Sequence, residues 1–525
     1  MLARTIALFL VLAGGAAAQE LRIGMKAAID GSDPHQSYSP NRNVQLHVYE
    51  PLVFQDAYQR PIPGLAESWR LIDATTWEFR LREGVTFHNG TPLHASDVIF
   101  SIQRAREARG IRTYSQNVRA ITTMEAPDAR TVILRTGGPA PMLPSLLASV
   151  GIVSAAAVGE AASEADWNGG RAAIGTGPFR WVRYTPGADV VIERAERHWA
   201  PLEPWRRVTY RFIPNDSARV AALLADDVDV IDAVPPALQP RVREDARTRL
   251  VVATTSFNFY IFLDVYRDVA PFVTTTDGQP LNRNPYRDVR VRRALSHAIN
   301  RQALATRAME GGAEPAGQVT PPNFIGHDPD LGLPAYDPGL ARRLLAEAGY
   351  PGGFGLTLQC TADRFAGDAR TCQAIGQMFT AVGLRTIVET LPTSVFFRRA
   401  GTGYAQNEPE FSASMSIFAS TSGLASESMN TILRTPNATL GHGASNRGRN
   451  ADPVLDGLLE RIESELDDTQ RAALTRAATR RVMEELPVIP VFWVRSAWGV
   501  RSNIRLAPRG DAYTMATSIR TATVP

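Results

Sequence analysis

Strand-type and helix-type patterns alternate along almost the whole 525-residue chain, and this alternation limits the folds open to it. Trp77–Gly84 and Arg130–Thr136 alternate apolar and polar residues, as half-buried strands do. His94–Glu107 begins with a Ser/Asp cap and continues with apolar residues on one helix face. Strands and helices interleaved in this way predict α/β domains. At about 150 residues per domain, the chain has room for about three.

The same patterns predict further elements. Leu21–Lys26 alternates like the edge of a sheet, and Asn43–Phe54 has helical apolar spacing. Helical stripes recur at 291–304, 337–349, 371–383 and 452–466, with strands expected at 356–360, 385–390 and 488–494. No stretch has the composition of a flexible linker, so we expect closely packed domains between which the chain crosses more than once.

The first 18 residues have the composition of a secretory signal peptide. Arg4 precedes an apolar run from Ile6 to Leu12, and three alanines stand before Gln19. A buried N-terminal helix is the alternative. There is no cysteine here for a lipid anchor, and no later run reaches transmembrane length. We therefore expect a soluble, exported periplasmic protein without membrane insertion.

Charge and motif content favour binding over catalysis. The net charge is only +3, and no basic stretch is interleaved with aromatic residues, so no nucleic-acid partner is expected. Lys26 is the only lysine. The chain has no G-x-S-x-G or H-E-x-x-H motif and no histidine cluster with metal-ligand spacing, so we expect no catalytic residues, cofactor or metal.

Cys360 and Cys372 are the only two cysteines and lie 12 positions apart. In an oxidising compartment we expect them to form a structural disulfide. Two buried thiols or a metal site are the alternatives, although no histidine lies near the pair in sequence.

Five segments occur in an order that points to one family. They are YEPLVFQD (49–56), 64–102, GTGPF followed by a strand and RHWA (175–200), 288–304 and 336–354. Together they resemble the family 5 extracellular solute-binding proteins of ABC importers. The likeness extends over nearly the whole chain after residue 18. On this reading the GTGPF turn is structural, with Gly175 and Gly177 allowing backbone angles closed to other residues and Pro178 leading into the strand.

The resemblance implies the α/β fold of a type II periplasmic binding protein, a two-lobed clamshell with an extra domain. Residues 19–47, 171–256 and 495–525 would form the core domain of lobe 1, residues 48–170 its inserted domain, and residues 257–494 lobe 2. Such a protein, expected to be a monomer, captures a small-molecule or peptide-like ligand between its lobes and delivers it to inner-membrane permease subunits. The ligand would be peptide-like, opine-like or another polar solute. A metal-chelate or haem-binding protein of the same fold, or an exported receptor or chaperone without a transport role, are the alternatives.

The resemblance also suggests ligand-binding residues. Ser32 and His35 lie in the loop that corresponds to the family's first cleft loop, although His35 would equally suit a solvated turn. Asn258 and Tyr260 would lie where the chain first crosses between the lobes, and Tyr260 is also a good core residue.

The segment 416–424 departs from the pattern of peptide binders. Phe418 stands at the family's aromatic position, and Thr421 stands where peptide binders commonly place an Asp that holds the ammonium group of the peptide. Without that carboxylate, an ordinary oligopeptide lacks its usual partner. Asn446 and Arg447, in a later loop, are candidates to anchor a carboxylate or phosphate, or to make polar contacts to a hydroxylated ligand. A solvated Arg447 is the alternative.

Overall fold

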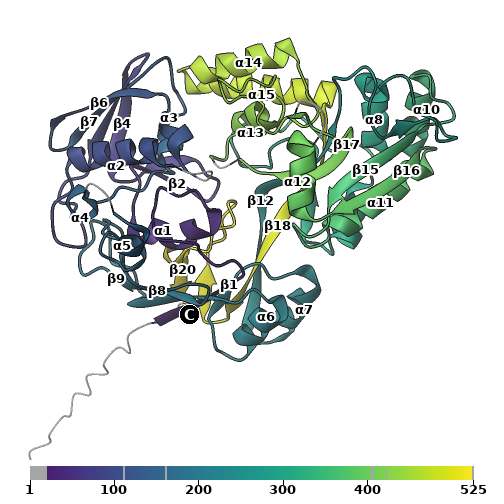
Figure 1. The fold of residues 1–525 in the computed structure, drawn as a ribbon. Coiled ribbons are helices and arrows are strands. Elements are labelled where there is room, and N and C mark those ends of the chain that lie inside the picture. Colours follow the sequence, from purple (N-terminus) through teal and green to yellow (C-terminus); the bar gives the residue numbers. More distant parts are fainter. Residues whose placement is uncertain (1–19, 110–112, 160–161, 404–406, 421, 523–525) are drawn as a thin grey trace, which may run out of the picture.

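A single twelve-stranded sheet runs through the whole molecule (Figure 1). The computed structural model describes residues 20–109, 113–159, 162–403, 407–420 and 422–522. The strand order is β13 (Val273–Thr274), β15 (Gly355–Thr361), β17 (Ala413–Phe418), β12 (Thr248–Leu263), β18 (Val488–Arg501), β11 (Val230–Ile231), β1 (Glu20–Met25), β10 (Arg207–Phe212), β9 (Asp189–Arg194) and β8 (Phe179–Thr185). Off this path, β14 (Ala313–Pro315) pairs with β18, and β16 (Arg385–Leu391) pairs with β15.

Two long antiparallel strands, β12 and β18, join the two halves of the molecule. We call residues 20–256 with 495–522 lobe 1, and residues 257–494 lobe 2. Trp498 packs in the core of lobe 1, whereas Phe259 and Phe492 pack in the core of lobe 2. The pairing loses its regular register between Thr254 and Asn258, at the passage from one core to the other. Each lobe therefore has its own hydrophobic core, and the strand pair bends between the two.

Strand β1 lies inside the sheet, so our expectation of an edge strand was wrong. It pairs in parallel with β10 on one side and β11 on the other. The polar residue that suggested exposure, Arg22, pairs with Asp229 at 2.8 Å and with Asp226 at 3.0 Å. These ion pairs satisfy the guanidinium beside an otherwise buried strand.

Lobe 1 also contains a separate four-stranded antiparallel sheet with helices packed on it, within the residues predicted to form the inserted domain. Its strand order is β4 (Ala66–Asp73), β5 (Thr76–Leu81), β7 (Thr131–Thr136) and β6 (Ile121–Asp128). The expected helix 43–54 is shorter than its pattern suggested: α1 is Arg42–Val48, and Val53–Gln55 forms β2, paired with β3 (Pro61–Pro63). Pro51 explains the early end, because proline disfavours helical geometry in the residue before it. The other helices of lobe 1 are α2 (Ala95–Glu107), α3 (Leu143–Leu147), α4 (Ala155–Val158), α5 (Glu164–Asn168), α6 (Asp216–Leu224) and α7 (Gln239–Glu244).

The GTGPF turn packs against the end of α1 and has a structural role. A Cβ on Gly175 would lie 1.9 Å from the carbonyl oxygen of Val48, and one on Gly177 would lie 2.2 Å from that of His47. The glycines are needed for this close approach and not, as we expected, for unusual angles, since neither has a positive φ. Thr176 Oγ1 donates to the buried carboxylate of Glu50 at 2.9 Å.

The RHWA segment meets the same carboxylate. His198 Nε2 lies 3.0 Å from Glu50 Oε1, and the indole nitrogen of Trp199 donates to that oxygen at 3.1 Å. Glu50 thus joins the start of the inserted domain to the two segments that follow it. The turn and the RHWA segment, distant in sequence, meet at one acidic side chain.

Helices cover both faces of the sheet in lobe 2 (Figure 1). On one face lie α8 (Val289–Ala298), α10 (Pro338–Glu347) and α11 (Asp368–Ala381), and on the other lie α13 (Ala425–Ile432), α14 (Pro453–Ser464) and α15 (Asp468–Glu485). The expected helix 291–304 is divided, because Ile299 is extended and Asn300 caps the short α9 (Arg301–Ala303). The sequence patterns did not predict α15.

The predicted disulfide is present. Cys360 on β15 is bonded to Cys372 on α11, their Cα atoms are 6.3 Å apart, and both residues are fully buried. It ties a strand of the lobe 2 sheet to the helix that covers it.

We predict that thiol titration of the denatured, unreduced protein finds no free thiol. Replacing both cysteines by alanine should lower the free energy of unfolding by about 3 kcal/mol, the usual value for so short a closed loop. Urea unfolding of the variant measures this loss. Two reactive thiols in the unreduced wild type would contradict the prediction.

Candidate functional site

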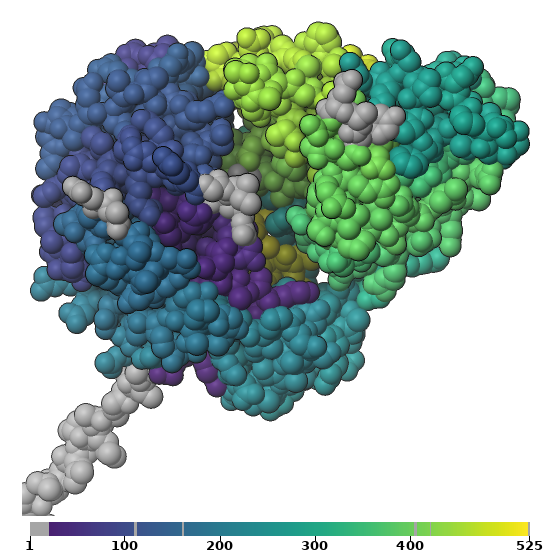
Figure 2. Space-filling view, in the orientation of Figure 1, coloured from purple at the N-terminus to yellow at the C-terminus, as the bar shows by residue number. Residues whose placement is uncertain are grey.

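The two lobes enclose a hollow. Figure 2 shows it between the N-terminal half of the molecule and the green part of lobe 2. The lobes touch where Gln55 Nε2 donates to the carbonyl oxygen of Ser422 at 3.4 Å and where the rings of Tyr58 and Phe324 meet at 5.8 Å. The turn after β2 therefore faces the segment that follows β17.

That segment lies at one particular edge of the lobe 2 sheet. Strands β15, β16 and β17 are parallel, so they end at the same edge. Three segments leave it: the loop 362–367 after β15, helix α12 (Thr393–Thr402) after β16, and residues 419–424 after β17. Ligands of open α/β sheets bind beyond the carboxyl ends of the strands. This edge, facing lobe 1, is our candidate site.

Two arginines converge on one aromatic ring of α12, Arg364 from the loop at this edge and Arg447 from a loop near the amino end of β17. The guanidinium carbon of Arg364 lies 5.0 Å from the ring centre of Phe397 on α12, and that of Arg447 lies 5.1 Å from it. Arg447 also lies 5.0 Å from the ring of Phe262 and donates to Ser416 Oγ at 3.0 Å. We call these two residues the arginine pair.

The arginine pair carries charge that no ion pair among the described residues neutralises. In that part of the chain, neither guanidinium forms an ion pair with a carboxylate. Burial lowers the pKa of Arg364, and the nearby charge of Asp368 opposes this only in part. Burial, together with the like charge of Arg364, lowers the pKa of Arg447 to about 10. By contrast, Arg449 beside it pairs with Glu408 at 2.6 Å. A carboxylate placed between the pair would accept hydrogen bonds and neutralise charge at little cost in reorganisation.

A cavity of about 250 Å³ adjoins Arg447, between α12 and the loop 443–449, and Arg364 does not line it. Phe397, Arg447 and Arg449 line it, and all of its lining residues belong to lobe 2.

In the loop that carries the predicted ligand-binding residues Ser32 and His35, both side chains contact other residues of lobe 1. His35 is fully buried: its Nδ1 accepts from Arg104 at 2.8 Å, and its Nε2 lies 3.0 Å from the carbonyl oxygen of Gly151. Burial lowers the pKa of His35 to about 4, so the ring is neutral. The backbone nitrogen and Oγ of Ser32 lie 3.0 and 3.3 Å from Asn168 Oδ1 beside a cavity of about 430 Å³. These contacts favour a structural role for His35 over ligand contact.

Asn258 and Tyr260 are also buried and bonded inside the protein. Asn258 Nδ2 donates to the carbonyl oxygens of Gln318 and Val319, and the Tyr260 hydroxyl donates to that of Val319 at 3.0 Å. Tyr260 belongs to the core under α13 and α14. The core alternative for Tyr260 has the stronger support.

The remaining predicted ligand-binding residues, Phe418, Thr421, Asn446 and Arg447, differ in how well the structure supports a place in the site. Phe418 ends β17 and is half-buried against the same core, at the candidate edge. Thr421 lies outside the described residues. Asn446 is buried, and its amide bonds the backbone of Arg434 and Asn450, so it holds the loop in shape. Of the predicted site residues, Arg447 is a member of the arginine pair, and Phe418 ends the strand at the candidate edge.

Arg364 and Phe397 were missed by sequence reasoning. Arg364 comes three residues after the end of β15, and the rule that ligands bind beyond parallel strand ends was the available signal. Phe397 had no such signal, since it lies in a helix directly after another phenylalanine and before two arginines.

Comparison with known proteins identifies the family. Residues 60–439 match the profile of the bacterial extracellular solute-binding proteins, family 5 Middle. The chain belongs to this family. The glutathione-binding protein GsiB of Escherichia coli (strain K12) is 25% identical over 501 residues, which cover 94% of this chain and 92% of GsiB.

Solved structures share the two-lobed type II fold. The unliganded open form of the periplasmic murein tripeptide binding protein MppA is 21% identical, with a TM-score of 0.79 over 96% of this chain and 98% of that one. HbpA2 from Haemophilus parasuis is 22% identical, with a TM-score of 0.81 over 96% and 100%. In the described part of the chain, no helix is both long and apolar enough to cross a bilayer.

Membership of the family establishes the general activity. Family 5 members are periplasmic proteins that bind solutes, peptide-like ones among them, for import by ABC transporters. The chain is therefore a solute-binding transport protein and not an enzyme.

Proposed function

We propose that the solute carries a carboxylate and that the arginine pair holds it on lobe 2. The observation that supports this most is that two guanidiniums meet at the ring of Phe397 without a carboxylate ion-pair partner among the described residues. A planar guanidinium offers paired donors that match a carboxylate. The loss of the family's Asp at Thr421 favours a ligand whose recognition depends on its acidic end.

The ligands for which several relatives are named, or with which they were solved, fit this chemistry. GsiB is named for glutathione, MppA for a murein tripeptide, and AgaA was solved with agropinic acid. Glutathione and tripeptides end in carboxylates, and agropinic acid is an acid by name. We infer a peptide-like or opine-like acid for this chain. A nickel–histidine complex, the ligand of NikZ, is the alternative.

Binding would bring the lobes together. A ligand held by the arginine pair and touching lobe 1 favours the closed form by its higher affinity for that form. We propose that a monomer closes by bending β12 near residues 254–258 and β18 near residue 494, and that permease subunits recognise the closed form. The core domain (19–47, 171–256, 495–525), the inserted domain (48–170) and lobe 2 (257–494) would move as units.

A thermal-shift screen tests the ligand class. Peptides, opines, oligosaccharides and metal chelates would each be added to the mature protein. A ligand at 100 times its Kd stabilises the folded state by about 2.7 kcal/mol. We expect stabilisation by an acidic peptide or opine. Stabilisation by a neutral oligosaccharide alone would contradict the proposal.

We also propose that residues 1–18 are removed on export. Mass spectrometry of the protein from the native periplasm should show a chain that begins at or within a few residues of Gln19. Residues 1–19 lie outside the described part of the chain. An exported protein that retains Met1 would refute this prediction.

A further inference from the structure

We propose that the Cys360–Cys372 disulfide and the carboxylate of Asp368 hold the loop that carries Arg364, and so set the affinity of the site for its ligand. This inference rests on the proposed function, because it concerns the same arginine pair. It assigns positioning roles to residues that do not touch the ligand themselves.

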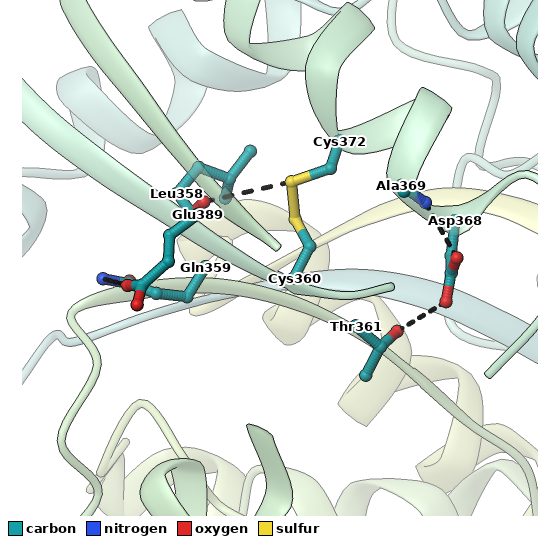
Figure 3. Close-up of a disulfide and its surroundings, with 8 residues drawn as sticks. All are labelled: Leu358, Gln359, Cys360, Thr361, Asp368, Ala369, Cys372 and Glu389. Carbon is teal, nitrogen blue, oxygen red and sulfur yellow. Dashed lines mark hydrogen bonds between the residues drawn. A yellow bond between two sulfur atoms is a disulfide. The ribbon is translucent and has the colours of Figure 1, made fainter. Parts of the chain in front are cut away.

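The disulfide closes the loop at its two ends (Figure 3). Cys360 lies near the end of β15, and Cys372 lies in α11, which starts at Asp368. The eleven intervening residues, Arg364 among them, must therefore leave the sheet and return to within 6.3 Å. Closing a short loop removes much of its conformational freedom.

Asp368 fixes the loop from inside. It is 1% exposed, and its Oδ2 accepts from Thr361 Oγ1 at 2.8 Å and from the backbone nitrogen of Arg364 at 3.1 Å. Its Oδ1 lies 2.8 Å from the nitrogen of Ala369. One buried carboxylate thus bonds the end of β15, the backbone of Arg364 and the first turn of α11 (Figure 3 shows its bonds to Thr361 and Ala369).

The neighbour of Arg364 is also anchored. The ring of Phe365 packs 5.8 Å from Phe259 and 6.2 Å from Phe257, both on β12. Arg364 itself is exposed. The backbone on both sides of this exposed cation is therefore bonded or packed into lobe 2, which is how a preorganised binding group is built.

A more mobile loop 362–367 should weaken ligand binding even while lobe 2 stays folded. A mobile Arg364 must be ordered again when ligand binds, and ordering one such side chain and its loop raises Kd about two- to tenfold. Both sulfur-bearing residues are fully buried, so a reductant reaches the bond only when the loop opens locally. Affinity would then depend on the redox state of a pair that the folded protein shields.

The experiment compares wild type with Cys360→Ala/Cys372→Ala and with Asp368→Asn. Hydrogen exchange without ligand reports the amides of Arg364 and Phe365, both of which donate to Asp368. Calorimetric titration with S-methylglutathione, which has no thiol to reduce the disulfide, reports Kd. We expect about tenfold faster exchange at these two amides and a two- to tenfold higher Kd in both variants.

Leu345→Ala is the matched control, because Leu345 packs in the same core from α10 and makes no contact with the loop that we describe. It should lower stability without changing loop exchange or Kd. Unchanged exchange in both test variants, or Kd values that simply follow stability across all three, would overturn the inference. If wild type does not bind S-methylglutathione, the choice of ligand under the proposed function fails, and loop exchange still decides the positioning role.

Discussion

Replacing Arg447 by methionine is expected to raise Kd for the acidic ligand by a factor that corresponds to about 2–5 kcal/mol, the usual effect of removing one partner of a desolvated charged hydrogen bond. Methionine keeps much of the apolar contact with Phe262 and Phe397 and removes the charge. The ligand-free protein should lose little stability, because the guanidinium has no carboxylate partner among the described residues. Calorimetric titration and thermal unfolding measure the two effects.

Two further variants make this test specific. Arg447→Lys keeps the charge without the planar fork and should give an intermediate loss of affinity. Arg449→Met removes an arginine that lines the same cavity but already pairs with Glu408, and it should leave Kd nearly unchanged. Equal losses for Arg447→Met and Arg449→Met would mean that general positive charge, and not the arginine pair, attracts the ligand.

Glu50→Ala should have the largest effect on stability, about 3–5 kcal/mol, as expected when one partner of a buried ionic cluster is removed. Glu50 is 1% exposed and accepts from Thr176 and Trp199, with His198 at 3.0 Å. The variant leaves these three polar groups without their partner at a largely buried position. Urea unfolding, with the slope of the transition compared between variants, measures the loss.

Glu67→Ala is the control for this variant, because Glu67 is a partly exposed acid of the same domain that pairs with Arg130. Its removal should change stability by less than about 1 kcal/mol. Glu50→Gln keeps an acceptor oxygen and should fall between the two. A loss below 1 kcal/mol for Glu50→Ala would show that the cluster contributes little to joining the domains.

Local patterns predicted most of the elements, and the errors have physical causes. Apolar periodicity identified α2, α10, α11 and α14, since each buries one face. It failed for β1, because Arg22 gives this inner strand the alternating pattern of an edge strand. In the fold, ion pairs with Asp226 and Asp229 satisfy that arginine. It also missed α15, whose polar residues dominate a weakly amphipathic stretch.

The candidate site was harder to predict, because it is made by packing between distant segments. Arg364, Phe397 and Arg447 come from three segments that meet only when β15, β16 and β17 align. The family resemblance selected Phe418 and Arg447, and both belong to the region that we propose as the site. It also selected Asn446, whose side-chain amide hydrogen-bonds the backbone of Arg434 and Asn450 within the same region of lobe 2. Residue type alone does not reveal this structural role.

The most direct measurement of the central claim is a thermal-shift comparison of matched acids and esters. S-methylglutathione, a tripeptide and an opine would each be tested beside the ester that lacks free carboxylates. If the arginine pair holds a carboxylate, at least one acid stabilises the protein, by about 2.7 kcal/mol at 100 times its Kd, and its ester does not. Equal stabilisation by an acid and its ester would contradict carboxylate recognition at this site.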